Sequence, residues 1–376
     1  MNQQKPRATL RTLAQHLGIS VTTVSRALKD GAEVNAETID RVKRAADKLG
    51  YRPNTGGVNL RTGRSQSIAM VLSFERQEQL NIVTASLLVG ISTAMKARGY
   101  RTGIVPHLQH DDPLDIVRNL AREGSVDGVI ITHTRPQDER VKYLLEIGMP
   151  FVTFGRTELL SAHPYVDLDH EQIGADAARL LLDNGHPAPL LFAPSSQFSY
   201  SLQFVKGWTK TFNARNLTVP DELIHFSATT PQSGVDMARE VLLRHPESTG
   251  AFVASDEAGL GFITAMQQAG RQIGKDFGLI TYGGARLHDF LSPPTSAFYY
   301  PHAGIADLLS EMLARAIDGE DYAQLRRVVP GEFVDHGSHI LGHPRCGISS
   351  GRLRRSIELG AAVLPAVGHG RSHGHV

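Results

Sequence analysis

Cysteine and tryptophan are almost absent from this chain: Cys346 and Trp208 are the single examples among 376 residues. A lone cysteine excludes an internal disulfide and is typical of a reducing compartment, so we expect a cytoplasmic protein. The sequence also lacks an apolar run long enough to span a membrane, and its polar, basic start lacks the apolar segment of a signal peptide. We therefore expect neither a membrane partner nor export.

Catalytic signatures are missing as well. The sequence contains no phosphate-binding Gly-x4-Gly-Lys-Ser/Thr loop. The pattern Gly-x-Ser-x-Gly occurs at 347–351 and 370–374, but both copies lie in the Gly- and His-rich tail and not between an expected strand and an expected helix, so we expect no nucleophile elbow. Asp167 and Asp169 look like a carboxylate pair, but alternate residues of a strand point to opposite faces, so the two need not converge. The polar residues at 107–112 suggest a metal site, yet they fall in an expected loop, where such residues are ordinary. We expect no enzyme activity, no cofactor and no metal.

Positive charge is concentrated at the start of the chain. Residues 1–65 contain 12 Lys and Arg against 5 Asp and Glu, a net charge of +7, whereas the whole chain carries only +1. The rest of the chain therefore carries −6. A basic head on an acidic body is typical of a module that meets the phosphates of nucleic acids.

The beginning of that head predicts two short helices separated by a glycine turn. Residues 10–17 place apolar side chains at helical spacing, Gly18 permits the turn, and Ser20 can cap a second helix that ends near Leu28. The second helix leaves a small, polar, cationic face outside: Val21, Thr22, Ser25 and Arg26. Such a face suits the major groove of DNA, so the pattern predicts a helix-turn-helix. An ordinary helical hairpin shares the glycine turn and stays open on these residues alone.

The next residues complete a recognisable order of motifs. A third helix is predicted from the candidate N-cap Asn35 to the stop signal Gly50, followed by a basic segment that contains one exposed leucine, Leu60. With these blocks the chain resembles the LacI/GalR family of bacterial transcription regulators, and the resemblance continues to about Ser338. The matching blocks keep the family's order and spacing: Val24-Ser25-Arg26, Leu49-Gly50-Tyr51-Arg52-Pro53-Asn54 and Leu60-Arg61-Thr62-Gly63.

The resemblance implies a protein that binds palindromic double-stranded operator DNA as a homodimer, with a tetramer left open. It implies a helix-turn-helix domain over 1–55, a hinge helix over 56–65 and an effector-binding and dimerisation domain over 66–338. In the hinge, Leu60 is expected to wedge between base pairs in the minor groove and kink the duplex. The residues expected to contact DNA are Thr9, Ser20, Val21, Thr22, Thr23, Ser25, Arg26, Tyr51, Asn54, Asn59, Leu60 and Arg61.

Beyond the hinge, short apolar runs alternate with amphipathic helical patterns. Near-continuous apolar strands separated by helices are typical of parallel sheets covered on both faces. Two successive series predict two doubly wound lobes with ligands at the carboxyl ends of the strands. The resemblance implies the same α/β architecture, like that of type I periplasmic binding proteins, with three crossings between the lobes. We place lobe 1 at 66–166 and 295–322 and lobe 2 at 167–293 and 323–338.

The resemblance also implies a small-molecule effector, expected to be a sugar, in the cleft between the lobes. Sugars are recognised by acids and amides that bind paired hydroxyl groups and by a flat apolar surface against the ring. Asp169 and Asp256 also stand at predicted helix starts, where an acid can act as a cap instead, and Trp208 lies inside a helix, where it can be a core residue. The residues carried over as effector contacts are Ser73, Thr132, Arg156, Asp169, Trp208, Ser255 and Asp256.

Two positions depart from the family pattern. Phe204 stands where an arginine is common, and Gly283-Gly284 stands where two aspartates are usual, so both changes remove charge from the cleft. We therefore expect a neutral sugar other than the effectors of the lactose and purine repressors. The stretches 111–115 and 155–158 resemble those of regulators of α-glucoside uptake. The tail, 339–376, is rich in Gly, His and Arg, leaves the family pattern and predicts disorder.

Two other classes of function compete with this interpretation. A sugar-binding receptor without a role in transcription would share the two-lobed core, but it would need a signal peptide and would have no use for residues 9–64. An enzyme would need a convergent nucleophile, base or metal set, which the sequence lacks. The sequence therefore favours a ligand-responsive, sequence-specific DNA-binding regulator, expected to repress genes of carbohydrate uptake or catabolism.

Overall fold

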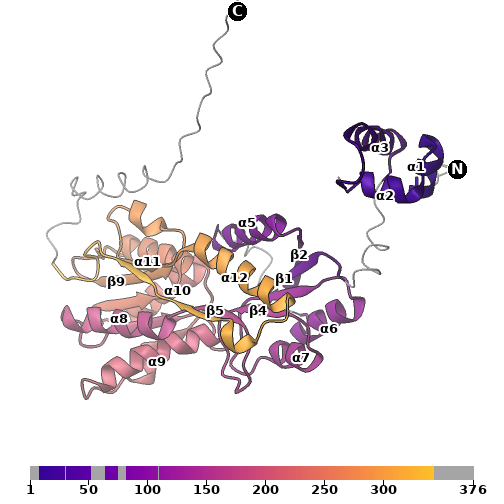
Figure 1. The fold of residues 1–376 in the computed structure, drawn as a ribbon. Helices are drawn as coiled ribbons and strands as arrows, with labels where there is room; N and C mark the ends of the chain where they lie inside the picture. The colour runs from indigo at the N-terminus through magenta and orange to yellow at the C-terminus, as the bar shows by residue number, and fades with distance from the viewer. Residues whose placement is uncertain (1–7, 30, 52–63, 75–81, 109, 343–376) are drawn as a thin grey trace, which may run out of the picture. The chain divides into compact units, whose positions relative to one another are not determined.

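The structure, a computed structural model, divides into an N-terminal unit, Met1–Gln66, and a second unit, Ser67–Val376 (Figure 1). It combines a helical helix-turn-helix unit with a two-lobed α/β unit built on parallel sheets, as the sequence predicts. Each unit is described by itself. The residues that the structure describes are 8–29, 31–51, 64–74, 82–108 and 110–342.

Local signals in the sequence set the boundaries of the helices in the N-terminal unit. These are α1 (Leu10–Leu17), α2 (Val21–Ala27) and α3 (Ala36–Leu49). Gly18 ends α1 in the left-handed region at φ 66°, and the Ser20 hydroxyl accepts a hydrogen bond from the Thr23 backbone N–H at the start of α2. Small apolar side chains from all three helices form the core: Leu13, Ala14, Val24, Ala27, Val42, Ala45 and Ala46.

The first sheet of the second unit has the strand order β11-β5-β4-β3-β1-β2, and its described strand pairs are parallel. Its strands are β1 (Ser67–Phe74), β2 (Arg101–Leu108), β3 (Gly128–Ile131), β4 (Phe151–Phe154), β5 (Tyr165–Leu168) and β11 (Arg326–Val329). The helices of this lobe are α5 (Ile82–Ala97), α6 (Pro113–Glu123), α7 (Glu139–Ile147) and α12 (His302–Ile317).

Alternating side chains along the strands of this first sheet belong to two different hydrophobic cores. Ile130 and Val152 belong to a core with α5 and α12, which lie side by side in Figure 1, whereas Val129 and Phe151 belong to a core with α6 and α7. Successive residues of a strand point to opposite faces, so a strand that is apolar throughout can bury both faces. This explains why the short strands read as continuous apolar runs.

The second sheet has the strand order β12-β10-β9-β8-β6-β7, in which β10 and β12 are antiparallel. Its strands are β6 (Leu190–Ala193), β7 (Ile224–Phe226), β8 (Gly250–Val253), β9 (Gly278–Gly283), β10 (Ala297–Tyr299) and β12 (Glu332–Val334). Its helices are α8 (His170–Asp183), α9 (Ser199–Asn213), α10 (Pro231–Arg244) and α11 (Asp256–Gln268). Three short 3-10 helices are η1 (Asp221–Leu223), η2 (Leu287–Phe290) and η3 (Tyr322–Gln324).

The chain crosses between the two sheets after β5, after β10 and after β11. Two of the predicted lobe assignments are therefore wrong. β10, which we expected to open the return to lobe 1, pairs with β9 in the second sheet, and β11, which we assigned to lobe 2, pairs with β5 in the first. A short strand takes its sheet from its hydrogen-bond partner, and the partner cannot be read from the strand's own residues.

Candidate functional site

The second helix of the N-terminal unit presents the polar face that the sequence predicts. Val24 and Ala27 are fully buried, while Val21 remains 42% exposed and Thr22 and Arg26 are exposed. The helix is only seven residues long, so its exposed side chains form one compact patch. A helix that buries its apolar side and presents a threonine and an arginine has the chemistry needed to contact base edges and phosphates.

Several other residues expected to contact DNA also have local structural partners. Thr9 and Thr12 form a reciprocal capping box at the start of α1, and the hydroxyls of Ser20 and Thr23 lie 2.8 Å apart at the start of α2. Tyr51 is partly buried against the core of the unit. Ser25 is partly exposed. Four further residues of the predicted set lie outside the described residues: Asn54, Asn59, Leu60 and Arg61.

The second unit contains a cavity of about 210 Å³ where the carboxyl ends of strands from both sheets meet. The ends of β3 and β4 supply Thr132 and Gly155, and the ends of β8 and β9 supply Ser255 and Gly283. This is the place at which parallel α/β sheets bind ligands, because loops and helix starts converge there. The lining also includes Thr84 and Leu87 of the helix α5.

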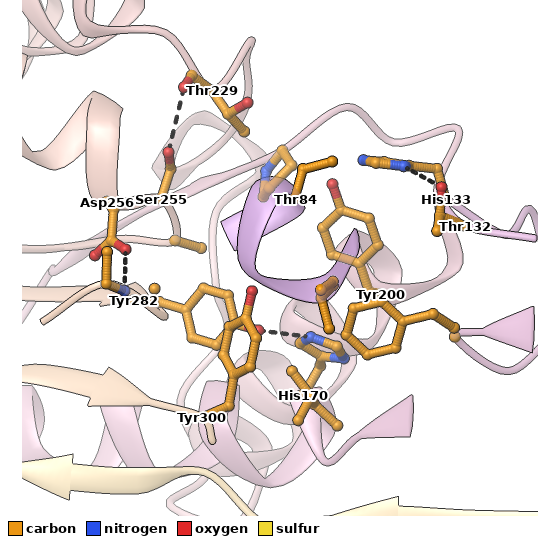
Figure 2. A pocket seen from close by; sticks show the side chains of 18 of the residues that line it. Thr84, Thr132, His133, His170, Tyr200, Thr229, Ser255, Asp256, Tyr282 and Tyr300 are labelled. Carbon is orange, nitrogen blue, oxygen red and sulfur yellow. Dashed lines mark hydrogen bonds between the residues drawn. The ribbon is translucent and has the colours of Figure 1, made fainter. Parts of the chain in front are cut away.

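Tyrosine and histidine side chains form an aromatic wall of this cavity (Figure 2). The rings of Tyr282 and Tyr300 stack with centroids 5.6 Å apart, and the His170 ring lies 5.5 Å from Tyr200 and 5.7 Å from Tyr282. Burial raises the pKa of the Tyr282 and Tyr300 phenols well above the usual value. Both remain neutral at physiological pH and can donate and accept hydrogen bonds.

Asp256 also lines the cavity and is held in place by two backbone amides. Its Oδ2 accepts hydrogen bonds from the N–H groups of Gly284 (2.9 Å) and Ala285 (3.2 Å), and its Oδ1 lies 3.4 Å from Nε2 of the buried His288. A Cβ atom at Gly283 would overlap the Asp256 carboxylate. Gly283 therefore leaves the space into which the Asp256 carboxylate fits, whereas a Cβ atom at Gly284 would overlap the His302 ring.

Asp167 connects the cavity to both lobes. Its carboxylate is buried, with Oδ2 3.1 Å from Arg156 Nε and Oδ1 3.5 Å from His170 Nδ1. The other ring nitrogen, Nε2 of His170, lies 3.0 Å from the Tyr282 hydroxyl. Arg156 also donates to Oε1 of Gln203 on α9 at 3.0 Å. A chain of ion-pair and hydrogen-bond contacts thus runs from lobe 1 through the lining of the cavity to lobe 2.

A buried ion pair fixes the loop that follows β3. Arg140 donates to Asp138 at 2.7 Å, and the same guanidinium nitrogen donates to the carbonyl oxygens of Thr132 (3.3 Å) and His133 (3.0 Å). Both latter residues line the cavity. The Thr132 hydroxyl donates to the carbonyl of Val71 and lies 3.1 Å from His133 Nδ1. Burial and the nearby Arg140 charge lower the pKa of His133 to about 4, so its ring is neutral.

The structure brings three of the predicted effector contacts into the cavity lining, namely Thr132, Ser255 and Asp256. Asp169 instead caps α8 by accepting a hydrogen bond from the Gln172 backbone N–H, as its position at a helix start allowed. Arg156 does not line the cavity and pairs with Asp167, which does.

Trp208 is completely buried between Phe212 and Phe252, so it presents no surface to a ligand. The expectation of an aromatic platform at Trp208 is therefore not supported by its position. Ser73 lies near the end of β1, and its side chain is outside the described part of the structure.

Sequence reasoning missed most of the aromatic wall. Tyr282 lies near the end of β9 and Tyr300 follows β10, and the signal that could have found them is that position at a carboxyl strand end. Tyr200 and His170 sit in the first turn of α9 and at the start of α8, where helices begin above the sheet. These four side chains, and not Trp208, form the aromatic surface of the cavity.

In the described residues, no helix is both long and apolar enough to span a bilayer. Within the part of the chain that the structure describes, no three or more His, Cys, Asp or Glu side chains cluster in a way that could hold a metal ion.

Both units match known protein families. Residues 9–54 match the model for bacterial regulatory proteins of the lacI family, and residues 83–319 match the model for periplasmic binding proteins and the sugar binding domain of the LacI family. The HTH-type transcriptional regulator AglR of Rhizobium meliloti (strain 1021) is 32% identical over 320 residues, which cover 84% of this chain and 90% of the relative. The HTH-type transcriptional regulator CelR of Thermobifida fusca is 27% identical over 333 residues, covering 87% and 97%.

Solved structures show the same architecture. The transcriptional regulator CelR in complex with cellobiose superposes with a TM-score of 0.66 at 25% identity, covering 88% of this chain and 100% of that chain. The lac repressor dimer bound to operator and the anti-inducer ONPF superposes with a TM-score of 0.76 at 19% identity, covering 89% and 100%, a likeness of fold. The family models and the relatives agree with the geometry of both units, and the chain belongs to the LacI family of bacterial DNA-binding transcriptional regulators.

Proposed function

We propose that this regulator is a repressor that binds palindromic operator DNA as a homodimer and changes its operator affinity when a neutral sugar binds in the cavity of the second unit. The observation that carries the proposal is the composition of that cavity. Stacked tyrosine rings line this cavity together with the hydroxyl group of Ser255 and the carboxylate group of Asp256. Such a combination binds the apolar face of a sugar ring and its paired hydroxyl groups together.

Charge in the lining argues against a phosphorylated effector. The lining of the cavity, within the described residues, includes the acids Asp167, Asp256 and Glu257. It includes no lysine and no arginine among those described residues. Burial, together with the neighbouring Asp256, raises the pKa of Glu257, as expected for a partly desolvated acid beside another acid. A phosphate group placed there would meet the carboxyl groups of Asp256 and Glu257 at short range, with no lysine or arginine in the described lining itself to offset them. The site therefore favours an uncharged ligand.

The size of the cavity and the relatives favour a small glucoside. A volume of about 210 Å³ lies below the usual range of small-molecule pockets, roughly 300–1,000 Å³, which favours one or two sugar rings over a longer oligosaccharide. A relative of known structure, CelR, has been solved with the disaccharide cellobiose. The loop residues that resemble regulators of α-glucoside uptake extend the candidates to α-linked glucosides. We therefore propose a neutral mono- or disaccharide of glucose as the effector.

The DNA-binding side of the proposal assigns base reading to the exposed face of α2, through Val21, Thr22 and Arg26. One short helix contacts only a half-site, so a palindromic operator requires a second copy of the chain related by twofold symmetry. Changing Thr22 should alter the preferred base at one operator position by about 1–3 kcal/mol. Equal loss of affinity for every operator variant would show that Thr22 does not read a base.

The effector is tested by titration of the purified full-length protein with cellobiose, maltose, sucrose, trehalose and glucose 6-phosphate, followed by calorimetry and by thermal unfolding. At least one neutral sugar should raise the unfolding temperature and change the affinity for operator DNA, measured by fluorescence anisotropy. Tyr300→Ala should abolish the response to that sugar while operator binding without sugar stays intact, because Tyr300 forms part of the aromatic wall.

The result that overturns the proposal is preferential binding of glucose 6-phosphate, or a sugar response that survives Tyr300→Ala unchanged. Dimerisation is measured separately by light scattering coupled to size-exclusion chromatography, with and without operator. Repression is measured with a reporter gene placed behind the selected operator. Expression that rises when the chain is supplied would reverse the assignment as a repressor.

A further inference from the structure

An ion pair at the edge of the DNA-binding face carries an inference beyond the assignment of α2. The Arg26 Nη1 atom lies 2.7 Å from Glu33 Oε2, and the two side chains are 58% and 69% exposed. An exposed ion pair of this kind contributes only about 0–1 kcal/mol to stability. The ion pair therefore contributes little to folding. It can still influence how Arg26 contacts DNA.

The backbone of the turn after α2 fixes the place of Glu33 independently of the ion pair. The N–H groups of Lys29 and Gly31 both donate to the carbonyl of Arg26, at 3.1 and 3.0 Å, and the Val34 N–H donates to the carbonyl of Gly31 at 2.9 Å. The turn therefore folds back over the end of α2, and Val34 packs against the core of the unit. The fold of the turn thus places the Glu33 carboxylate beside Arg26.

The chemistry of the guanidinium group makes this pairing compatible with base recognition. A guanidinium group carries five N–H donors, and the closest contact to Glu33 uses Nη1, so donors remain for an outside partner. Two parallel donors match the O6 and N7 acceptors of guanine in the major groove. A long arginine side chain otherwise samples many rotamers, and ordering it on binding costs conformational entropy.

We propose that Glu33 is a positioning residue that holds Arg26 oriented for bidentate recognition of one guanine, and that it thereby sharpens operator specificity. The inference rests on the proposed reading of DNA by α2. Glu33 also places a negative charge near the phosphates, where it weakens binding to all DNA alike. The charge effect leaves discrimination unchanged, whereas the alignment of Arg26 strengthens binding to the correct base alone.

The test uses full-length protein and duplexes enriched by the parent protein from a pool with a randomised core. Affinities for every single-base variant of the enriched duplex are measured by fluorescence anisotropy. Arg26→Lys keeps the charge but replaces the rigid planar fork of parallel donors by a flexible point charge, so the position at which it weakens the preference is the base pair read by Arg26. Glu33→Gln should reduce discrimination at that same base pair about fivefold or more, a share of the 1–3 kcal/mol expected of one bidentate contact.

Glu37→Gln is the matched control, because it removes the same charge from another exposed glutamate of the unit. Both glutamine variants should raise affinity for random-sequence DNA by similar factors, and only Glu33→Gln should flatten the preference. In an Arg26→Lys background, Glu33→Gln should leave discrimination unchanged. Far-UV circular dichroism melting of each variant verifies that the helices remain folded.

The outcomes separate the inference from the assignment on which it rests. If Arg26→Lys leaves every base preference intact, the reading of DNA by Arg26 is wrong. If Arg26→Lys flattens one position and Glu33→Gln behaves like Glu37→Gln there, Arg26 reads DNA and the positioning role of Glu33 is wrong. If Glu33→Gln instead increases discrimination at that position, Glu33 competes with the base for Arg26, which also overturns the inference.

Discussion

The buried ion pair between Asp138 and Arg140 allows a stability prediction to be worked from its contacts. The two side chains are only 2% and 3% exposed. Asp138 Oδ1 accepts hydrogen bonds from the backbone N–H and Nε of Arg140, and Oδ2 accepts from Nη2 of Arg140 and from the backbone N–H of Arg135. Asp138→Asn removes the negative charge and leaves the guanidinium buried without its counterion.

The expected cost follows from this burial. Breaking a buried pair by neutralising one partner costs about 3–5 kcal/mol, because the remaining charge has lost its compensation. The matched control is Asp115→Asn, which removes an aspartate paired with Arg118 at 3.2 Å with side chains 63% and 40% exposed. That exposed pair should contribute less than about 1 kcal/mol. The difference between the two variants measures burial rather than the loss of one aspartate charge.

Urea unfolding of the full-length chain, followed by far-UV circular dichroism, measures both variants. A free-energy loss for Asp138→Asn below about 1 kcal/mol, or equal to that of Asp115→Asn, would refute the reasoning. Burial raises the pKa of the Asp138 carboxyl, but the hydrogen bonds and charge of Arg140 outweigh it, and the net pKa is lowered. The stabilisation is therefore present above the unfolded-state pKa and is lost as pH falls through the lower folded-state value.

Three further predictions test the cavity, its acid response and the hinge. Gly283→Ala should displace Asp256, lower the free energy of unfolding in urea by about 1–3 kcal/mol and weaken sugar binding measured by calorimetry. The control is Gly304→Ala, whose added Cβ atom meets no neighbour and should not destabilise the chain. Because the pKa of His133 falls from 6.5 to about 4 on burial, the unfolded chain takes up a proton that the folded chain does not, so stability should decrease as pH falls from 6.5 toward 4. His133→Gln should make urea midpoints less dependent on pH over that interval, and an unchanged dependence would remove His133 as the cause. Leu60→Ala should lower operator affinity and abolish bending in a circular-permutation gel assay, while sugar binding stays intact; a variant that bends the operator normally would exclude the wedge.

Local chemistry explains why the N-terminal unit could be predicted residue by residue. The start of α2 at Ser20 and the ends of α1 and α3 at Gly18 and Gly50 follow from a hydroxyl cap and two left-handed glycines. These signals act within one turn of helix, so no distant contact can overrule them. The alternation of strands and helices in the second unit was predictable for a similar reason, because apolar period and helix length are local properties.

Sheet membership and the cavity lining depend on contacts between residues far apart in the sequence. The sequence pattern places β10 and β11 in the wrong lobes because each is a short run whose partner strand decides its place. The prediction for Trp208 fails for a different reason. Phe204, Trp208 and Phe212 follow each other at intervals of four residues and are all buried, which is the spacing of a core stripe on one helix face. The family resemblance implies that Trp208 contacts the effector, whereas its helical spacing favours a role in the core.

The pair Gly283-Gly284 shows how a departure from a family pattern acquires a physical meaning only in the folded chain. From the sequence, the loss of two aspartates indicates a less charged cleft. In the structure, the absent side chain at Gly283 is the space occupied by the Asp256 carboxylate, and the Gly284 amide donates to it. Restoring an aspartate at Gly283 would therefore add a clash as well as a charge. The cleft keeps one acid in a fixed place beside the tyrosines, which is an arrangement suited to a paired hydroxyl of a neutral sugar.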